Sequence, residues 1–148
     1  MRLLAFFVLA SALSGCGPPI DQAADIKPDG MPSYDAFVGA TQFPYVASMD
    51  RREQLLTGLA KATPCLSKPS VEALLGKPDY SRLACPKEPD RKCKGTTWMY
   101  FLRANSATST GSDPVLEVFF NAQDRATWFV TEHVQGTHEV GGLVERCT

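Results

Sequence analysis

The first sixteen residues constrain this chain most, because they decide which part of it is left to fold. A basic residue at position 2 is followed by an apolar run at 3–10, and Leu-Ser-Gly at 13–15 directly precedes Cys16. A positive start, a short apolar core and small residues before a cut are typical of a secretory signal peptide. The run is too short to span a bilayer, which takes about 20 residues. We therefore expect residues 1–15 to be a signal peptide.

Cys16, placed directly after that tripeptide, is typical of a bacterial lipobox. Its thiol can take a diacylglycerol, and its amine, once freed by cleavage, can take a further acyl chain such as palmitate. At about 0.8 kcal/mol per buried CH2, several chains anchor a protein far more firmly than one. We expect this covalent lipid and no other cofactor. Gly17 stands where some inner-membrane lipoproteins have aspartate, so we expect the outer membrane, facing the periplasm, with the inner membrane or cell surface as alternatives.

The other four cysteines predict disulfides, because an exported domain folds where disulfides persist. Cys65, Cys85, Cys93 and Cys147 allow three pairings. Cys85 with Cys93 is favoured, since they flank a Pro- and charge-rich loop at 86–92 that folds back easily, and Cys65 with Cys147 then follows by elimination. A zinc site is the competing interpretation, but no Cys-x-x-Cys pair occurs, and we expect no metal.

The charge balance argues against nucleic acid as a partner. Removing residues 1–15 takes one arginine and no acid from the 15 basic and 16 acidic residues, so the mature chain is slightly acidic. Nucleic-acid binding relies on clustered lysine and arginine, and no such block is present. The expected partners are the membrane, through the lipid, and another envelope protein.

Patterns along the mature chain predict a tether and one small domain. Residues 16–48 contain scattered Pro, Asp and Gly without a sustained period, although 37–38 and 43–46 are apolar enough to pack on a domain. A capping box and spaced leucines predict a helix over 50–62. Ser67 as a cap, Pro69 in the first turn and Gly76 beyond the end predict another over 68–75.

After the second helix the apolar pattern changes to a period of two. Residues 96–103, 115–120 and 126–131 read as three strands, and a tight turn at 121–124 joins the last two. A meander is the simplest connection. Two helices against a three-stranded antiparallel sheet make a two-layer α+β domain, here assigned to residues 49–148.

Four segments carry a family resemblance: Leu-Ser-Lys-Pro-Ser-Val at 66–71, Leu-Gly-Lys-Pro at 75–78, Trp-Met-Tyr at 98–100 and Leu-Glu-Val-Phe-Phe-Asn at 116–121. Together they resemble the SmpA/OmlA (BamE-like) family of small outer-membrane lipoproteins, over about residues 65–131. The resemblance implies an ααβββ fold, which also occurs in β-lactamase-inhibitor-like proteins, and a link to outer-membrane biogenesis. The shared residues are explained as helix caps and core side chains, so the resemblance supports the fold more than a function.

Strand alternation indicates a candidate partner face on the sheet. If Trp98, Leu116 and Trp128 face the helices, the opposite face receives four large apolar side chains; these are Met99, Phe101, Phe119 and Phe129. An open sheet face is normally polar. The cluster therefore needs a cover, which is either another segment of this chain or a partner protein, or else the assumed strand register is in error.

No catalytic residues are expected. Neither His133 nor His138 has metal-ligand spacing, and adjacent Glu132–His133 and His138–Glu139 pairs point apart in an extended strand. No nucleophile elbow or phosphate loop occurs. The sequence favours a non-catalytic envelope lipoprotein that binds another protein. The alternative is an inhibitor or immunity lipoprotein against a periplasmic hydrolase or toxin, with the loop between Cys85 and Cys93 as its rigid projection.

Overall fold

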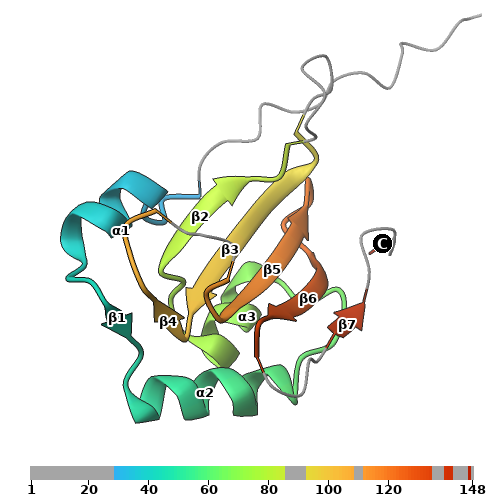
Figure 1. Ribbon diagram of the computed structural model, residues 1–148. Coiled ribbons are helices and arrows are strands. Elements are labelled where there is room, and N and C mark those ends of the chain that lie inside the picture. Colours follow the sequence, from blue (N-terminus) through green and yellow to red (C-terminus); the bar gives the residue numbers. More distant parts are fainter. Residues whose placement is uncertain (1–28, 86–92, 109–111, 135–138, 142–146, 148) are drawn as a thin grey trace, which may run out of the picture.

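The structure is a computed structural model that describes residues 29–85, 93–108, 112–134, 139–141 and 147. Within these residues it has three helices and seven strands (Figure 1). In chain order they are α1 (Tyr34–Ala40), β1 (Tyr45–Val46), α2 (Met49–Leu59), α3 (Lys68–Leu75), β2 (Tyr80–Leu83), β3 (Gly95–Phe101), β4 (Arg103–Ala104), β5 (Val115–Asn121), β6 (Ala126–Glu132) and β7 (Glu139–Gly141). The signal peptide and Cys16 lie outside the described residues.

The main sheet has five antiparallel strands in the order β2-β3-β5-β6-β7, and β1 pairs with β4 in a separate two-stranded sheet. The prediction of two helices on a three-stranded sheet is therefore wrong, although the structure is α+β. The additional strands β2 and β7 are four and three residues long. Segments this short carry too few alternations to be recognised from their sequence.

Helices α2 and α3 lie together on one face of the sheet, and Figure 1 shows α3 behind the strands. Ser48 caps α2, with its Oγ 3.2 Å from the N–H of Arg51, and the helix spans 49–59 rather than 50–62. Ser67 caps α3, which ends at Gly76 with a φ of +75°, as predicted. A Cβ on Gly58 would lie 2.6 Å from the Leu74 carbonyl oxygen, so glycine permits the close approach of the two helices.

The main core fills the space between these helices and the sheet. Its largest members are Trp98, Tyr100 and Phe129, all essentially inaccessible to solvent. The indole N–H of Trp98 donates to Asp29 Oδ2 at 2.6 Å, and Lys68 Nζ lies 3.2 Å from the same oxygen. Burial raises the pKa of Asp29, but the hydrogen bonds from Trp98, Lys68 and Ser81, together with the charge of Lys68, bring the pKa below its usual value. The ionised carboxylate thus fixes the start of the described chain against the core.

Residues 29–48 belong to the folded domain, although their composition had assigned them to the tether. The N–H of Ser81 donates to the Pro32 carbonyl at 2.9 Å, so this segment runs along the outer edge of β2. Helix α1 then packs on the sheet face opposite α2 and α3, through Phe37. The segment therefore passes from one face to the other, and the domain has a partial third layer. None of the helices that the structure describes is long and apolar enough to cross a bilayer.

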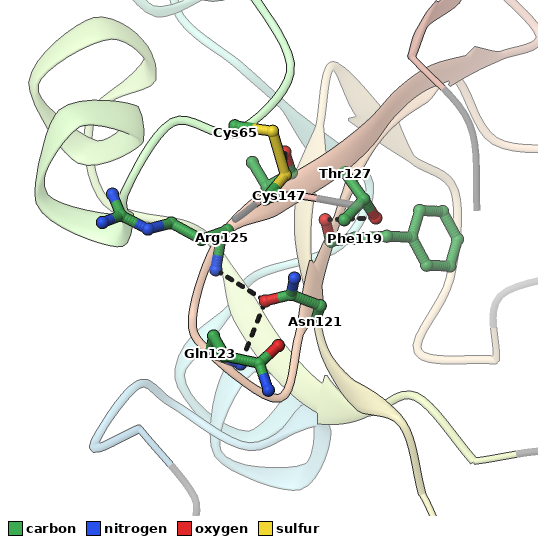
Figure 2. Close-up of a disulfide and its surroundings, with 8 residues drawn as sticks. Cys65, Phe119, Asn121, Gln123, Arg125, Thr127 and Cys147 are labelled. Atoms are coloured by element: carbon green, nitrogen blue, oxygen red, sulfur yellow. Dashed lines mark hydrogen bonds between the residues drawn. A yellow bond between two sulfur atoms is a disulfide. The ribbon is translucent and has the colours of Figure 1, made fainter. Parts of the chain in front are cut away.

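Both expected disulfides are present. Cys65 and Cys147 are 82 residues apart in sequence, and their bridge joins the loop before α3 to the C-terminal region (Figure 2). The N–H of Cys65 also donates to the Ala126 carbonyl at 2.7 Å, which holds this loop against β6. Cys85 and Cys93, eight residues apart, close the connection between β2 and β3.

Candidate functional site: the open face of the sheet

The sheet face opposite α2 and α3, hereafter the open face, carries three of the four side chains that the sequence placed there. Met99 and Phe101 are covered from within the chain. Phe37 of α1 stacks on Phe101, with ring centroids 5.5 Å apart and an interplanar angle of 13°. Both Met99 and Phe101 are at most 5% exposed. This part of the expected partner face is therefore interior, and the covering segment is the one before α2.

Phe129 was placed on the wrong face. It is completely buried in the main core, whereas Trp128, which the same alternation turned toward the helices, lies on the open face together with Val130. The cause is a register shift: Phe120 pairs with Ala126, but Phe119 pairs with Trp128, which leaves Thr127 as an extra residue in β6. An extra residue of this kind is a β-bulge, and it reverses the facing of all subsequent side chains.

The turn next to the bulge is held by local hydrogen bonds (Figure 2). Asn121 Oδ1 accepts from the N–H groups of both Gln123 and Arg125 at 3.0 Å, and Asp124 has a φ of +57°. Thr127 Oγ1 lies 3.5 Å from the Phe119 carbonyl oxygen, across the bulge. Asparagine and aspartate tolerate such turns well, so the residues that reverse the chain also set the facing of β6.

Phe119 lies on the open face as predicted, but its partner there is a residue that the sequence had turned inward. The rings of Phe119 and Trp128 stack with centroids 5.0 Å apart and an interplanar angle of 25°. Both side chains are only partly buried. The indole Nε1 of Trp128 is shielded from solvent, yet it has no hydrogen-bond partner among the described residues. Stacking thus leaves an aromatic surface beside the part of the face that α1 covers.

A groove of about 720 Å³ lies on the open face between α1 and the loop from β4 to β5. Strand side chains form its floor, and α1 and the loop form its walls. Tyr34 belongs to the wall, and its hydroxyl donates to the Ala107 carbonyl, which ties α1 to the loop. The lining residues are Tyr34, Tyr80, Arg82, Met99, Phe101, Ala107, Thr108, Asp113, Val115, Glu117 and Glu132.

The charged side chains of the groove are three carboxylates and one guanidinium. Arg82 lies 3.3 Å from Glu117 Oε2 and forms an ion pair with it. Burial raises the pKa of Glu117 above its ordinary value; Arg82 opposes this shift, and the nearby Glu132 adds to it. The groove therefore has an apolar floor with a net negative charge.

Asp113 is 3% exposed and has two differently placed oxygens. Its Oδ1 accepts from the backbone and side-chain N–H groups of Asn105, at 3.2 and 2.7 Å. Its Oδ2 is buried and has no partner among the residues that the structure describes. One half of this carboxylate thus shapes the loop, and the other half is a buried acceptor without a donor among the described residues.

Among these polar residues only Glu132 is considered in the sequence, as the neighbour of His133, although a signal is also present at Glu117. Glu117 interrupts the apolar strand segment at 115–120 and is 7% exposed. A carboxylate in the middle of an apolar strand indicates a paired or functional group, because burial of an unpaired charge is costly.

His133, which directly follows Glu132, does not line the groove. His133 follows β6, is exposed and has a φ of +55°, whereas His138 lies outside the described residues. In the described part of the chain no group of three or more His, Cys, Asp or Glu side chains is arranged to hold a metal ion.

No protein-family model matches this chain, and no curated protein or solved structure matches it either.

Proposed function

We propose that this chain is a non-catalytic, lipid-anchored envelope protein that binds another envelope protein through the open face of its sheet. The observation that carries the proposal is the stacked Phe119–Trp128 pair, which stays partly exposed beside an open groove. Aromatic side chains are enriched at protein interfaces and dominate their binding energy. The setting we propose is outer-membrane biogenesis, supported by the lipobox with Gly17 and by the family resemblance in sequence.

The anchor depends on Cys16 alone. Replacing Cys16 with alanine is expected to remove the acyl chains and to release the protein from the membrane, since the rest of the mature chain has no comparable anchor in its sequence pattern. Intact-mass measurement and membrane fractionation of wild type and variant test this. A wild-type mass equal to that of the unmodified chain would contradict the anchor.

Binding through the open face predicts that Phe119→Thr abolishes partner capture. Threonine keeps the strand propensity of the position but removes the stacked ring. The full-length protein is isolated from its native envelope in mild detergent, and co-isolated proteins are quantified by mass spectrometry. We expect the specific partner to fall at least tenfold with Phe119→Thr.

The matched control is Leu56→Gln. Leu56 is a large apolar side chain on α2, 47% exposed, on the opposite side of the sheet, and glutamine keeps the helix propensity. Capture should be unchanged in this variant. A partner that is retained by Phe119→Thr, or lost equally with Leu56→Gln, would overturn the use of the open face.

A second candidate is an inhibitor or immunity function at the β2–β3 connection. The Cys85–Cys93 disulfide closes this loop, and backbone hydrogen bonds of 2.9 Å between Ala84 and both Lys94 and Gly95 support its base. Residues 87–91, which would contact the target, lie outside the described residues. The same isolation separates the two proposals: a captured hydrolase or toxin that is lost on deletion of 87–91, but kept by Phe119→Thr, favours the inhibitor.

A further inference from the structure

The groove on the open face has more negative charge than the described residues of the chain neutralise. The ion pair of Arg82 with Glu117 offsets one carboxylate. Asp113 and Glu132 remain, and in the described part of the chain neither forms an ion pair with a lysine or arginine. Two uncompensated carboxylates in one apolar groove favour a cationic ligand.

The buried oxygen of Asp113 makes this more than an acidic patch. Oδ1 is occupied by Asn105, so the carboxylate is held in one orientation. Oδ2 is shielded from solvent and lacks a partner among the described residues. A buried carboxylate oxygen without a donor is unfavourable, and an ammonium or guanidinium N–H satisfies it with a short, charge-assisted hydrogen bond.

The apolar lining fits the rest of such a side chain. Tyr34, Tyr80 and Phe101 place aromatic rings around the groove. Aromatic faces attract ammonium and guanidinium groups, and they also pack against the methylene stems of lysine and arginine. The groove volume of about 720 Å³ accommodates one long side chain together with its flanking backbone.

We infer that the groove receives a lysine or arginine side chain of the partner protein, with Asp113 Oδ2 as its buried acceptor and Glu132 as a second, exposed counter-charge. This inference rests on the proposed protein-binding function and adds the chemistry that the partner must present. The stacked Phe119–Trp128 pair then provides the apolar contact, and the groove provides the charged one.

Blocked tripeptides test the charge preference directly. The probes are acetyl-Ala-X-Ala-amide with X as Arg, Lys, Gln or Glu, titrated into the isotope-labelled mature protein in a non-ionic maltoside detergent and followed by NMR chemical shifts. We expect the Arg and Lys peptides to shift resonances of groove residues and to bind at least tenfold more tightly than the Gln peptide, and the Glu peptide to give no shifts there. Equal affinity for Arg, Lys and Gln peptides would overturn the inference.

Two variants locate the acceptors. Asp113→Asn removes the charge but keeps an oxygen that can accept from Asn105. Glu132→Gln removes a charge at the exposed rim of the groove and leaves the β4–β5 loop unchanged. Each should weaken binding of the cationic peptides about tenfold. Glu53→Gln, at an exposed position of α2, removes the same charge outside the groove and should leave the affinity unchanged. Wild-type affinity in both groove variants would also overturn the inference. Glu132→Gln keeps the test decisive if Asp113→Asn fails to fold.

The inference and the proposed function fail in different ways. If capture of an envelope partner depends on Phe119 but the peptides show no charge preference, only the assignment of the groove is wrong. If the cationic peptides bind but capture of no envelope protein depends on Phe119, the proposed protein-binding function is wrong. The groove is then a site for cationic groups from another source.

Discussion

Replacing Phe129 with alanine is expected to lower the free energy of unfolding by about 3 to 5 kcal/mol, the usual cost of deleting a fully buried phenylalanine. Phe129 is 0% exposed and packs in the main core. Phe119 lies on the neighbouring strand but on the open face, where it is partly exposed. Phe119→Ala should therefore cost only about 1 to 2 kcal/mol, in proportion to its smaller buried area. Urea unfolding of both variants measures the difference.

The comparison of Phe129→Ala with Phe119→Ala tests the bulge at Thr127. Simple alternation along β6 gives Phe129 and Phe119 the same facing, whereas the observed register gives them opposite facings. Similar losses for the two variants, or a larger loss for Phe119→Ala, would contradict the described facing of β6.

Removing the Cys65–Cys147 disulfide, by replacing both cysteines with alanine, is expected to cost about 4.5 kcal/mol. The bridge closes a loop of 82 residues, and in the chain-entropy model the stabilisation grows with the logarithm of loop length. Without it, the loop before α3 keeps the Cys65 N–H bond to Ala126 but loses its covalent tie to the C-terminal region.

The Cys85–Cys93 disulfide is the matched control. It spans only eight residues, so its removal should cost about 2.5 kcal/mol by the same relation. Thermal and urea unfolding of the two double variants under identical oxidising conditions gives the comparison. A larger loss from the short loop than from the long one would show that loop closure does not govern these bridges.

The elements that could be predicted from sequence are those whose signals are local. Helix α3 has its cap at Ser67 and its stop at Gly76 within ten residues, and both are as expected. Strands β3, β5 and β6 are seven residues each, long enough for alternation to be recognised. The favoured disulfide also follows from a local feature, the loop between Cys85 and Cys93.

What could not be predicted depends on contacts between distant residues. Helix α1 is held by Phe37 against Phe101, 64 positions further along the chain, and nothing in its seven residues marks that contact. The bulge at Thr127 depends on pairing with β5 and reverses the facing of Phe129. The groove is assembled from positions between Tyr34 and Glu132, so its polar residues are recognisable as a group only in the folded chain.

Site-specific photocrosslinking in the native envelope tests the central claim, that the open face binds another envelope protein. A photoreactive residue replaces Phe119 in one version of the protein and Leu56, on the opposite side, in another. We predict that the Phe119 probe gives one dominant adduct with an envelope protein, and that the Leu56 probe does not give this adduct. No adduct from Phe119, or the same adduct from both positions, would contradict the account.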